Sequence, residues 1–358
     1  TMVFSSFIPV MHTNSQQGQI SETNLETGIG LDLLRADIEH AGFGLPWSFS
    51  GAPNPYNEPA AASAPAAMND APDVPRALSS MDATTFGLNN GSDYLSIKAL
   101  NVVRGTASQK WGWLWRDGTH TFPDATMQSM GAEPFVAADR VIVIQPRENR
   151  RLVIDGAGLN NFFAAYTPAA LDNFAPDESP LDPNGERYLI YGLDNTNAPQ
   201  RPFNRTDYYI NNANVPTHCA PGTGVLEKAT LNQTNNNFSF LPIVDCVADF
   251  QVVYYVDTST PPDGGWDTRA NANGLIGMDA EEIRNRVKSV RCYILTHEGG
   301  LDRNYNHPAA IVNVGEVDAA TGAILQANAG RAFDLSTLPG IGATWGNYRW
   351  KVYSLAVT

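Results

Sequence analysis

The chain has 358 residues and a formal net charge of −14, with 17% charged and 43% hydrophobic residues. Glycine (30) and proline (24) are frequent, which indicates a loop-rich globular protein and not a disordered one. The acidic balance excludes general nucleic-acid binding, because the phosphate backbone would be repelled.

Residues 1–45 form the N-terminal segment, which we expect to be mostly helical. Residues 2–11 are an apolar run of about ten residues, half of what a membrane span needs, so we interpret residues 1–12 as the end of a truncated hydrophobic segment. Residues 13–42 predict an amphipathic helix that stops at the glycines before Pro46. The apolar side chains that we expect to seat this helix on the rest of the protein are Ile20, Leu25, Ile29, Leu33, Leu34 and Ile38. Glycines inside the pattern, at 18, 28 and 30, each cost about 1 kcal/mol relative to alanine and favour local unwinding.

Residues 46–358 form the expected β-rich head. Its first stretch, 46–90, is rich in Pro, Ala and Asn and predicts a surface loop. Alternating apolar residues then predict strands over 94–100, 140–145, 151–155, 188–191, 207–210, 224–229, 247–256, 287–296 and 348–357. Strands and helices do not alternate regularly, so a doubly wound parallel sheet is not expected. The economical fold is α+β, with one long N-terminal helix packed on antiparallel β-sheet and large loop insertions.

No catalytic motif is found in the sequence, and we expect no enzyme activity. Gly28-Ile-Gly30 lacks the third glycine of a dinucleotide loop, and the six histidines are scattered without zinc spacing. Asp302, Asn304 and Asn306 resemble the first ligands of a calcium loop, although the glycine and glutamate of such a loop are missing. Loop calcium therefore stays open, and no other cofactor is expected.

Two further groups of residues, three tryptophans and three cysteines, each allow two interpretations. Trp111, Trp113 and Trp115 would project from one face of a strand, either as an aromatic platform for glycan, polymer or surface contact, or, as we favour, as a cover for the core or for the loop at 46–80. Of the three cysteines, Cys219 and Cys246 are the favoured pair for a disulfide, and three buried thiols are the alternative.

The segment from Gly28 to Phe43, Gly-Ile-Gly-Leu-Asp-Leu-Leu-Arg-Ala-Asp-Ile-Glu-His-Ala-Gly-Phe, resembles the helix end of PilW-type minor pilins of type IV pili. Segments beginning at Gly91, Asp207, Gly224, Ile243, Val287 and Tyr348 are similar to the successive strands of that family. Pseudopilins of the GspJ type share the same plan.

This resemblance implies a pilin-like fold and a non-catalytic structural subunit. Such a subunit would prime pilus assembly or sit near the filament tip through contacts with other minor pilins and the major pilin. The missing N-terminal segment would place it in the inner membrane, facing the periplasm, before assembly and on the extracellular pilus afterwards. The alternatives are a tip adhesin or ligand-binding module on the same scaffold, and a type II secretion pseudopilin.

Overall fold

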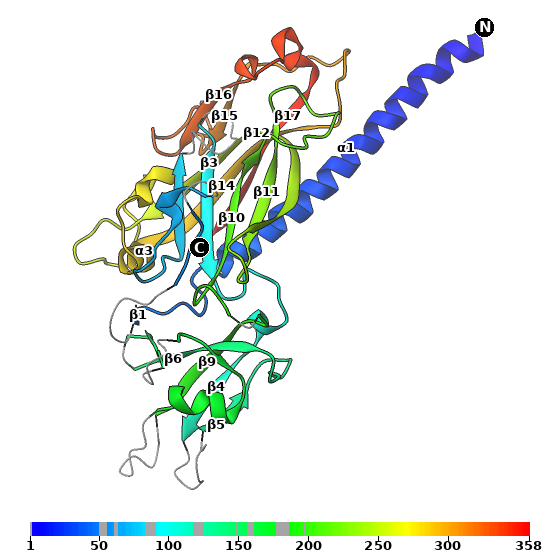
Figure 1. The fold of residues 1–358 in the computed structure, drawn as a ribbon. Helices are drawn as coiled ribbons and strands as arrows, with labels where there is room; N and C mark the ends of the chain where they lie inside the picture. Colours follow the sequence, from blue (N-terminus) through cyan, green and yellow to red (C-terminus); the bar gives the residue numbers. More distant parts are fainter. Residues whose placement is uncertain are drawn as a thin grey trace.

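The computed structural model describes residues 2–49, 56–60, 64–82, 91–116, 125–147, 149–155, 161–176, 186–196 and 198–358. Side chains of residues 2–16, 19 and 22 lie outside this description. Strands account for 38% of the residues and helices for 18%. Figure 1 shows two large sheets, one beyond the end of the other, and a long helix beside the first. The protein is mainly β, so the expected α+β, pilin-like class is wrong.

The N-terminal helix α1 runs without interruption from Met2 to Glu39. The unwinding expected at its glycines is therefore wrong. Figure 1 shows its N-terminal part standing clear of the sheets. The helix ends as expected, since Gly42 and Gly44 adopt positive φ angles of +81° and +72°, which glycine tolerates without steric cost. The apolar end expected at residues 1–12 lies outside the described side chains.

The first sheet has eight strands in the order β17-β14-β12-β11-β10-β3-β2, with β13 paired to β12. Every pairing in it is antiparallel. The bounds are β2 Leu78–Asp82, β3 Asp93–Ala99, β10 Asn204–Asn211, β11 Gly224–Leu231, β12 Phe238–Val256, β13 Thr268–Ala270, β14 Val287–Glu298 and β17 Arg349–Val357. The predicted strands from residue 207 onward all lie in this sheet, and the near-continuous burial of β12 and β14 shows that both of its faces are covered.

The two faces of this sheet carry different covers. On one face, α1 packs against β12, β14 and β17 over a core that includes Leu34, Phe250 and Ile294. On the other face, a hairpin of β15 (Ile311–Gly315) and β16 (Gly330–Asp334) covers a second core that includes Tyr293 and Trp350. The short helix α3, Ala280–Arg286, starts at a capping box between Asp279 and Glu282 and leads into β14.

The second sheet has seven strands in the order β1-β7-β6-β9-β4-β5, with β8 paired to β6. The bounds are β1 Ser48–Phe49, β4 Trp111–Arg116, β5 Ala125–Ser129, β6 Arg140–Gln145, β7 Arg151–Leu152, β8 Ala164–Ala165 and β9 Tyr188–Asp194, and the short helix α2 spans Pro168–Leu171. Most of this sheet is inserted between β3 and β10, which are hydrogen-bonded neighbours in the first sheet. The strands predicted over 140–145, 151–155 and 188–191 are found here as β6, β7 and β9, but they form a separate sheet, which is why the single-sheet plan fails.

The stretch expected to be a surface loop is partly buried. Glu58 accepts hydrogen bonds or ion pairs from Lys98 (2.9 Å) and Arg205 (3.2 Å), and Asp70 pairs with Lys98 and with Arg76, each at 2.5 Å. Burial raises the pKa of Glu58, but the two cations outweigh it and lower the pKa to about 2. These buried ion pairs hold residues 56–60 and 64–76 against β3 and β10. This stretch is therefore a loop, as expected, but buried charges anchor it, so it does not lie wholly on the surface. Residues 50–55, 61–63 and 83–90 lie outside the described part.

Candidate assembly surface on the N-terminal helix

The face of α1 that meets the sheet is made of small and polar residues as well as apolar ones. Thr23, Thr27, Gly30, Leu34 and Ile38 follow one another at three- or four-residue spacing, and all five are buried. Leu34 is 0% and Ile38 is 4% exposed. This row, the inner face of α1, is the seat of the helix.

Gly30 allows the helix to approach β12 closely. A Cβ atom at this position would lie 2.1 Å from the carbonyl oxygen of Ile243. Since no side chain fits there, the glycine that sequence analysis treated only as a helix weakener is required by packing.

Asp37 fixes the same face through a buried ion pair. Its Oδ2 accepts hydrogen bonds from the Tyr208 hydroxyl (2.6 Å) and from the Lys228 ammonium, which also donates to the Val102 carbonyl at 3.0 Å. Burial lowers the pKa of Lys228, and nearby Asp37 opposes that shift. Burial also raises the pKa of Tyr208, with the Asp37 charge adding to it. Sequence reasoning missed these three residues, although Asp37 lies three positions after Leu34 and so on the inner face.

A second polar contact holds α1 farther toward its N-terminus. The Tyr353 hydroxyl on β17 lies 2.6 Å from Asn24 Oδ1 and 2.8 Å from Glu298 Oε1. Asn24 also donates to the Ile20 carbonyl at 2.9 Å. Asn24 and Asp37 therefore fix the sheet-facing part of α1 at two points.

Two residues expected in the seat lie elsewhere. Leu25 is 67% and Ile29 is 63% exposed, so their assignment to the seat is wrong. Leu33 and Ile20 are only partly buried, whereas Leu34 and Ile38 take the expected place. The reason is that close approach at Gly30 sets the rotation of the helix, and residues 25 and 29 then point away from the sheet.

The exposed apolar residues continue onto the neighbouring strand. Leu241 of β12 is also exposed, and it lies on the α1 side of that strand because it pairs with Lys228, the partner of Asp37. Ile29 and Leu33 line a groove of about 350 Å³ with Leu241 and Ile243, and Glu26 and Asp245 provide its charged groups. We call Leu25, Ile29, Leu33 and Leu241 the outer stripe. An apolar surface of this kind on a helix and an adjoining strand is typical of a protein–protein contact.

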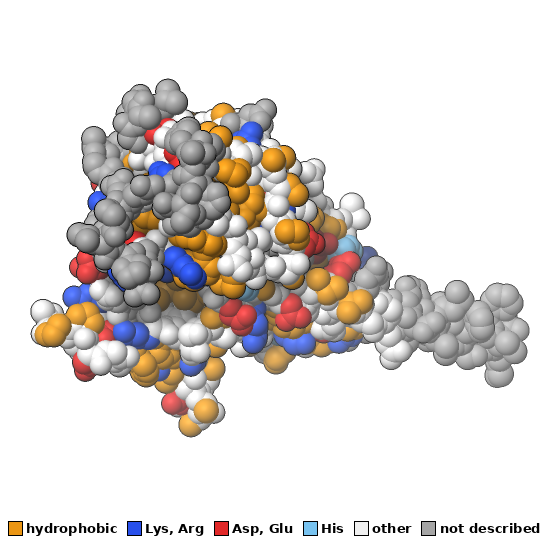
Figure 2. All heavy atoms as spheres, turned by 90° about the horizontal axis from the view of Figure 1, so that it is seen from below, with side chains coloured by type: hydrophobic (Ala, Val, Ile, Leu, Met, Phe, Trp, Pro, Cys, Tyr) orange, Lys and Arg blue, Asp and Glu red, His pale blue; other side chains and the backbone are white. Residues whose placement is uncertain are grey.

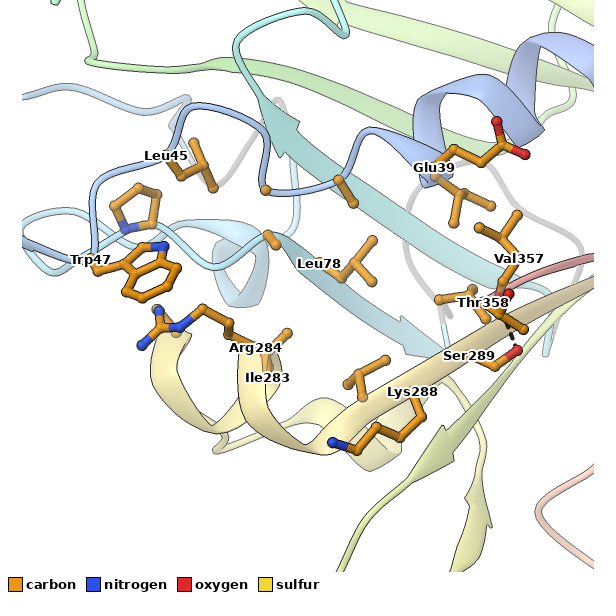
Figure 3. A pocket seen from close by; sticks show the side chains of 18 of the residues that line it. Glu39, Leu45, Trp47, Leu78, Ile283, Arg284, Lys288, Ser289, Val357 and Thr358 are labelled. Atoms are coloured by element: carbon orange, nitrogen blue, oxygen red, sulfur yellow. Dashed lines mark hydrogen bonds between the residues drawn. The ribbon is translucent and has the colours of Figure 1, made fainter. Parts of the chain in front are cut away.

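A second hollow lies where α1 leaves the sheet. It has a volume of about 380 Å³. Figure 3 shows Leu45, Leu78, Ile283 and Val357 lining it, with Glu39, Arg284 and Lys288 around them. The Arg284 guanidinium lies 4.0 Å from the centre of the Trp47 ring. Ser289 Oγ donates to the Val357 carbonyl at 2.8 Å, the dashed line in Figure 3. This hollow lies beside the C-terminal end of α1, away from the outer stripe.

The three tryptophans share one face of β4, as the alternation of a strand requires. All are half-buried, whereas Leu114 between them is fully buried on the other face. Trp111 packs against the core of the second sheet, its ring 6.4 Å from that of Trp113, and Arg187 lies over Trp115 at 5.2 Å. Seen from below, at the end of the molecule where β4 lies, hydrophobic side chains gather in separate patches among charged ones (Figure 2). The contacts of Trp111 favour the covering role over a platform.

The structure shows which of the three cysteines are paired and what contacts the residues of the suspected calcium loop. Cys219 and Cys246 form a disulfide, while Cys292 is buried and free. The Asp302 carboxylate accepts hydrogen bonds from the Arg349 guanidinium at 2.6 Å and from the backbone N–H of Asn304 at 3.0 Å. The Arg349 guanidinium thus stabilises this turn from the position that a bound cation would take in a calcium loop. In the described ranges, the one group of potential metal-ligand atoms is His218 with the two disulfide sulfurs, which are no longer thiolates.

No helix within the described residues is both long enough and apolar enough to cross a bilayer. The chain matches no protein-family model, no curated protein and no solved structure.

Proposed function

We propose that this protein is a non-catalytic structural subunit of a type IV pilus, of the minor-pilin kind, that assembles through α1. The observation that carries the proposal is that α1 has two faces with separate tasks. The inner face is buried on the protein's own sheet, and the outer stripe leaves Leu25 and Ile29 in solvent. Since exposing large apolar side chains on a helix is unfavourable for a lone protein, the outer stripe is best accounted for by a neighbouring subunit.

The resemblance of residues 28–43 to the helix end of PilW-type minor pilins gives the class of assembly. The two-sheet body departs from the pilin plan, so the proposal rests on α1 alone. The partners would be other minor pilins and the major pilin. The protein would reside at the inner membrane before assembly and in the extracellular filament afterwards.

Two matched variants on one helix test the proposal. The double substitution Leu25→Asp with Ile29→Asp changes only exposed side chains, so we expect the melting temperature to stay near that of the wild type while the chain disappears from sheared surface filaments. Leu34→Asp buries a carboxylate in the core and should lower the melting temperature markedly. Normal incorporation of the folded Leu25→Asp, Ile29→Asp chain into filaments would refute the assembly role of the outer stripe.

A further inference from the structure

The face of the eight-stranded sheet opposite α1 carries an open groove that the assembly proposal does not use. It has a volume of about 690 Å³ and lies between β12, β13, β14, the β15 end and β17. Its lining includes Tyr255, Trp266, Arg269, Arg291 and Glu316. Trp266 remains 46% exposed. We call this hollow the Trp266 groove.

A buried carboxylate organises the groove. Glu316 is almost fully buried, and it accepts hydrogen bonds from the Tyr255 hydroxyl, Arg269 Nε and Arg291 Nη1. One carboxylate therefore positions two guanidinium groups, and the cluster keeps a net positive charge within a chain whose formal charge is −14. An anionic ligand is attracted to such a local exception to the overall charge.

Aromatic rings and guanidinium groups alternate along the groove. Arg269 lies 5.0 Å from the centre of the Trp266 ring and 5.1 Å from that of Tyr255, and Arg291 lies 4.6 Å from the Tyr255 centre. The Tyr255 and Trp266 rings meet edge to face with centres 4.6 Å apart. These contacts fix the flexible arginine side chains before any ligand arrives, which lowers the entropy lost on binding.

The arginines retain donors for a ligand. A guanidinium has five N–H groups, and Glu316 takes one from each arginine. The Arg291 side chain is 38% exposed, so its outer N–H groups face the groove.

We propose that the Trp266 groove binds an acidic polysaccharide through its uronate units. The exposed indole offers a flat apolar surface for the C–H face of a sugar ring, and the paired guanidiniums match the planar carboxylate. The open form of the groove suits a chain that passes across it, and its place opposite α1 leaves it accessible when α1 is engaged.

The test is a titration of the full chain with oligogalacturonate and with oligomannuronate, followed by tryptophan fluorescence and calorimetry. We expect saturable binding that weakens with added salt. Trp266→Ala and Arg291→Gln should each weaken it at least tenfold. Trp47→Ala is the matched control, since Trp47 is also exposed and stacked on an arginine, Arg284, outside this groove; binding should be unchanged.

Three outcomes would overturn the proposal. The first is no saturable binding of either uronate oligomer to the folded chain at millimolar concentration. The second is equal binding of a neutral maltooligosaccharide. The third is binding of poly-glutamate as tight as that of the uronates and insensitive to Trp266→Ala, which would assign the groove to acidic peptides.

Discussion

The ion pair between Asp37 and Lys228 should be among the strongest single contributions to holding α1 on the sheet. Their side chains are 5% and 6% exposed. Among the described residues, Asp37→Ala would leave the buried Lys228 ammonium with the Val102 carbonyl as its one hydrogen-bond partner, and it would remove the acceptor of the Tyr208 hydroxyl. Removing one partner of a buried pair typically costs about 3–5 kcal/mol.

The assay is urea unfolding followed by circular dichroism, arranged as a double-mutant cycle. Asp37→Ala and Lys228→Met should each lower the free energy of unfolding by about 3–5 kcal/mol, whereas the double variant should lose much less than the sum of the two. Asp32→Ala is the control, because Asp32 lies on the exposed side of the same helix and should change stability by less than about 0.5 kcal/mol. Losses for Asp37→Ala no larger than for Asp32→Ala, or additive losses in the double variant, would refute this account.

Three other predictions concern the core, the helix and the disulfide. Burial lowers the pKa of His297 from 6.5 to about 3, so in that window the unfolded state binds a proton that the folded state does not. Stability should therefore fall by about 1.4 kcal/mol per unit as pH drops below 6.5, and His297→Gln, measured by denaturation at pH 7 and pH 5, should remove that part of the slope. Gly28→Ala meets open space and should stabilise by up to about 1 kcal/mol, whereas Gly30→Ala should destabilise because its Cβ would lie 2.1 Å from a β12 carbonyl oxygen; equal effects in thermal melts would contradict the close approach. Replacing Cys219 and Cys246, 27 residues apart, by alanine should cost about 3–4 kcal/mol in urea unfolding, and an unchanged midpoint would show that the bridge adds nothing.

Sequence patterns that span only a few residues correctly predicted several strands and the end of α1. The alternation in 247–256 and 287–296 predicted parts of β12 and β14, and the glycines after residue 41 predicted the end of α1. These predictions succeed because the period of a strand and the φ preference of glycine depend on neighbouring residues alone.

The strands β6, β7 and β9 were predicted, but their assembly into a second sheet and the burial of the loop could not be found in this way. Strands β1 and β8 of the seven-stranded sheet have only two residues, too few for a periodic signal, and no local pattern shows that predicted strands belong to two different sheets. Glu58 meets Arg205 across 147 positions of sequence, and no local property of either residue indicates that contact. A stretch rich in Pro and Ala therefore looked like a surface loop although its charged residues anchor it inside.

The sequence by itself determined that α1 is a long helix with apolar residues along it, that it stops before Pro46, and that antiparallel strands follow. Only the tertiary structure decided which side of the helix is buried. Leu25 and Leu34 look alike to any periodicity analysis, because both lie on apolar rows of the same helix. Gly30 against the Ile243 carbonyl and Asp37 against Lys228 set the helix rotation. This rotation decides that Leu34 is buried on the sheet and that Leu25 is exposed.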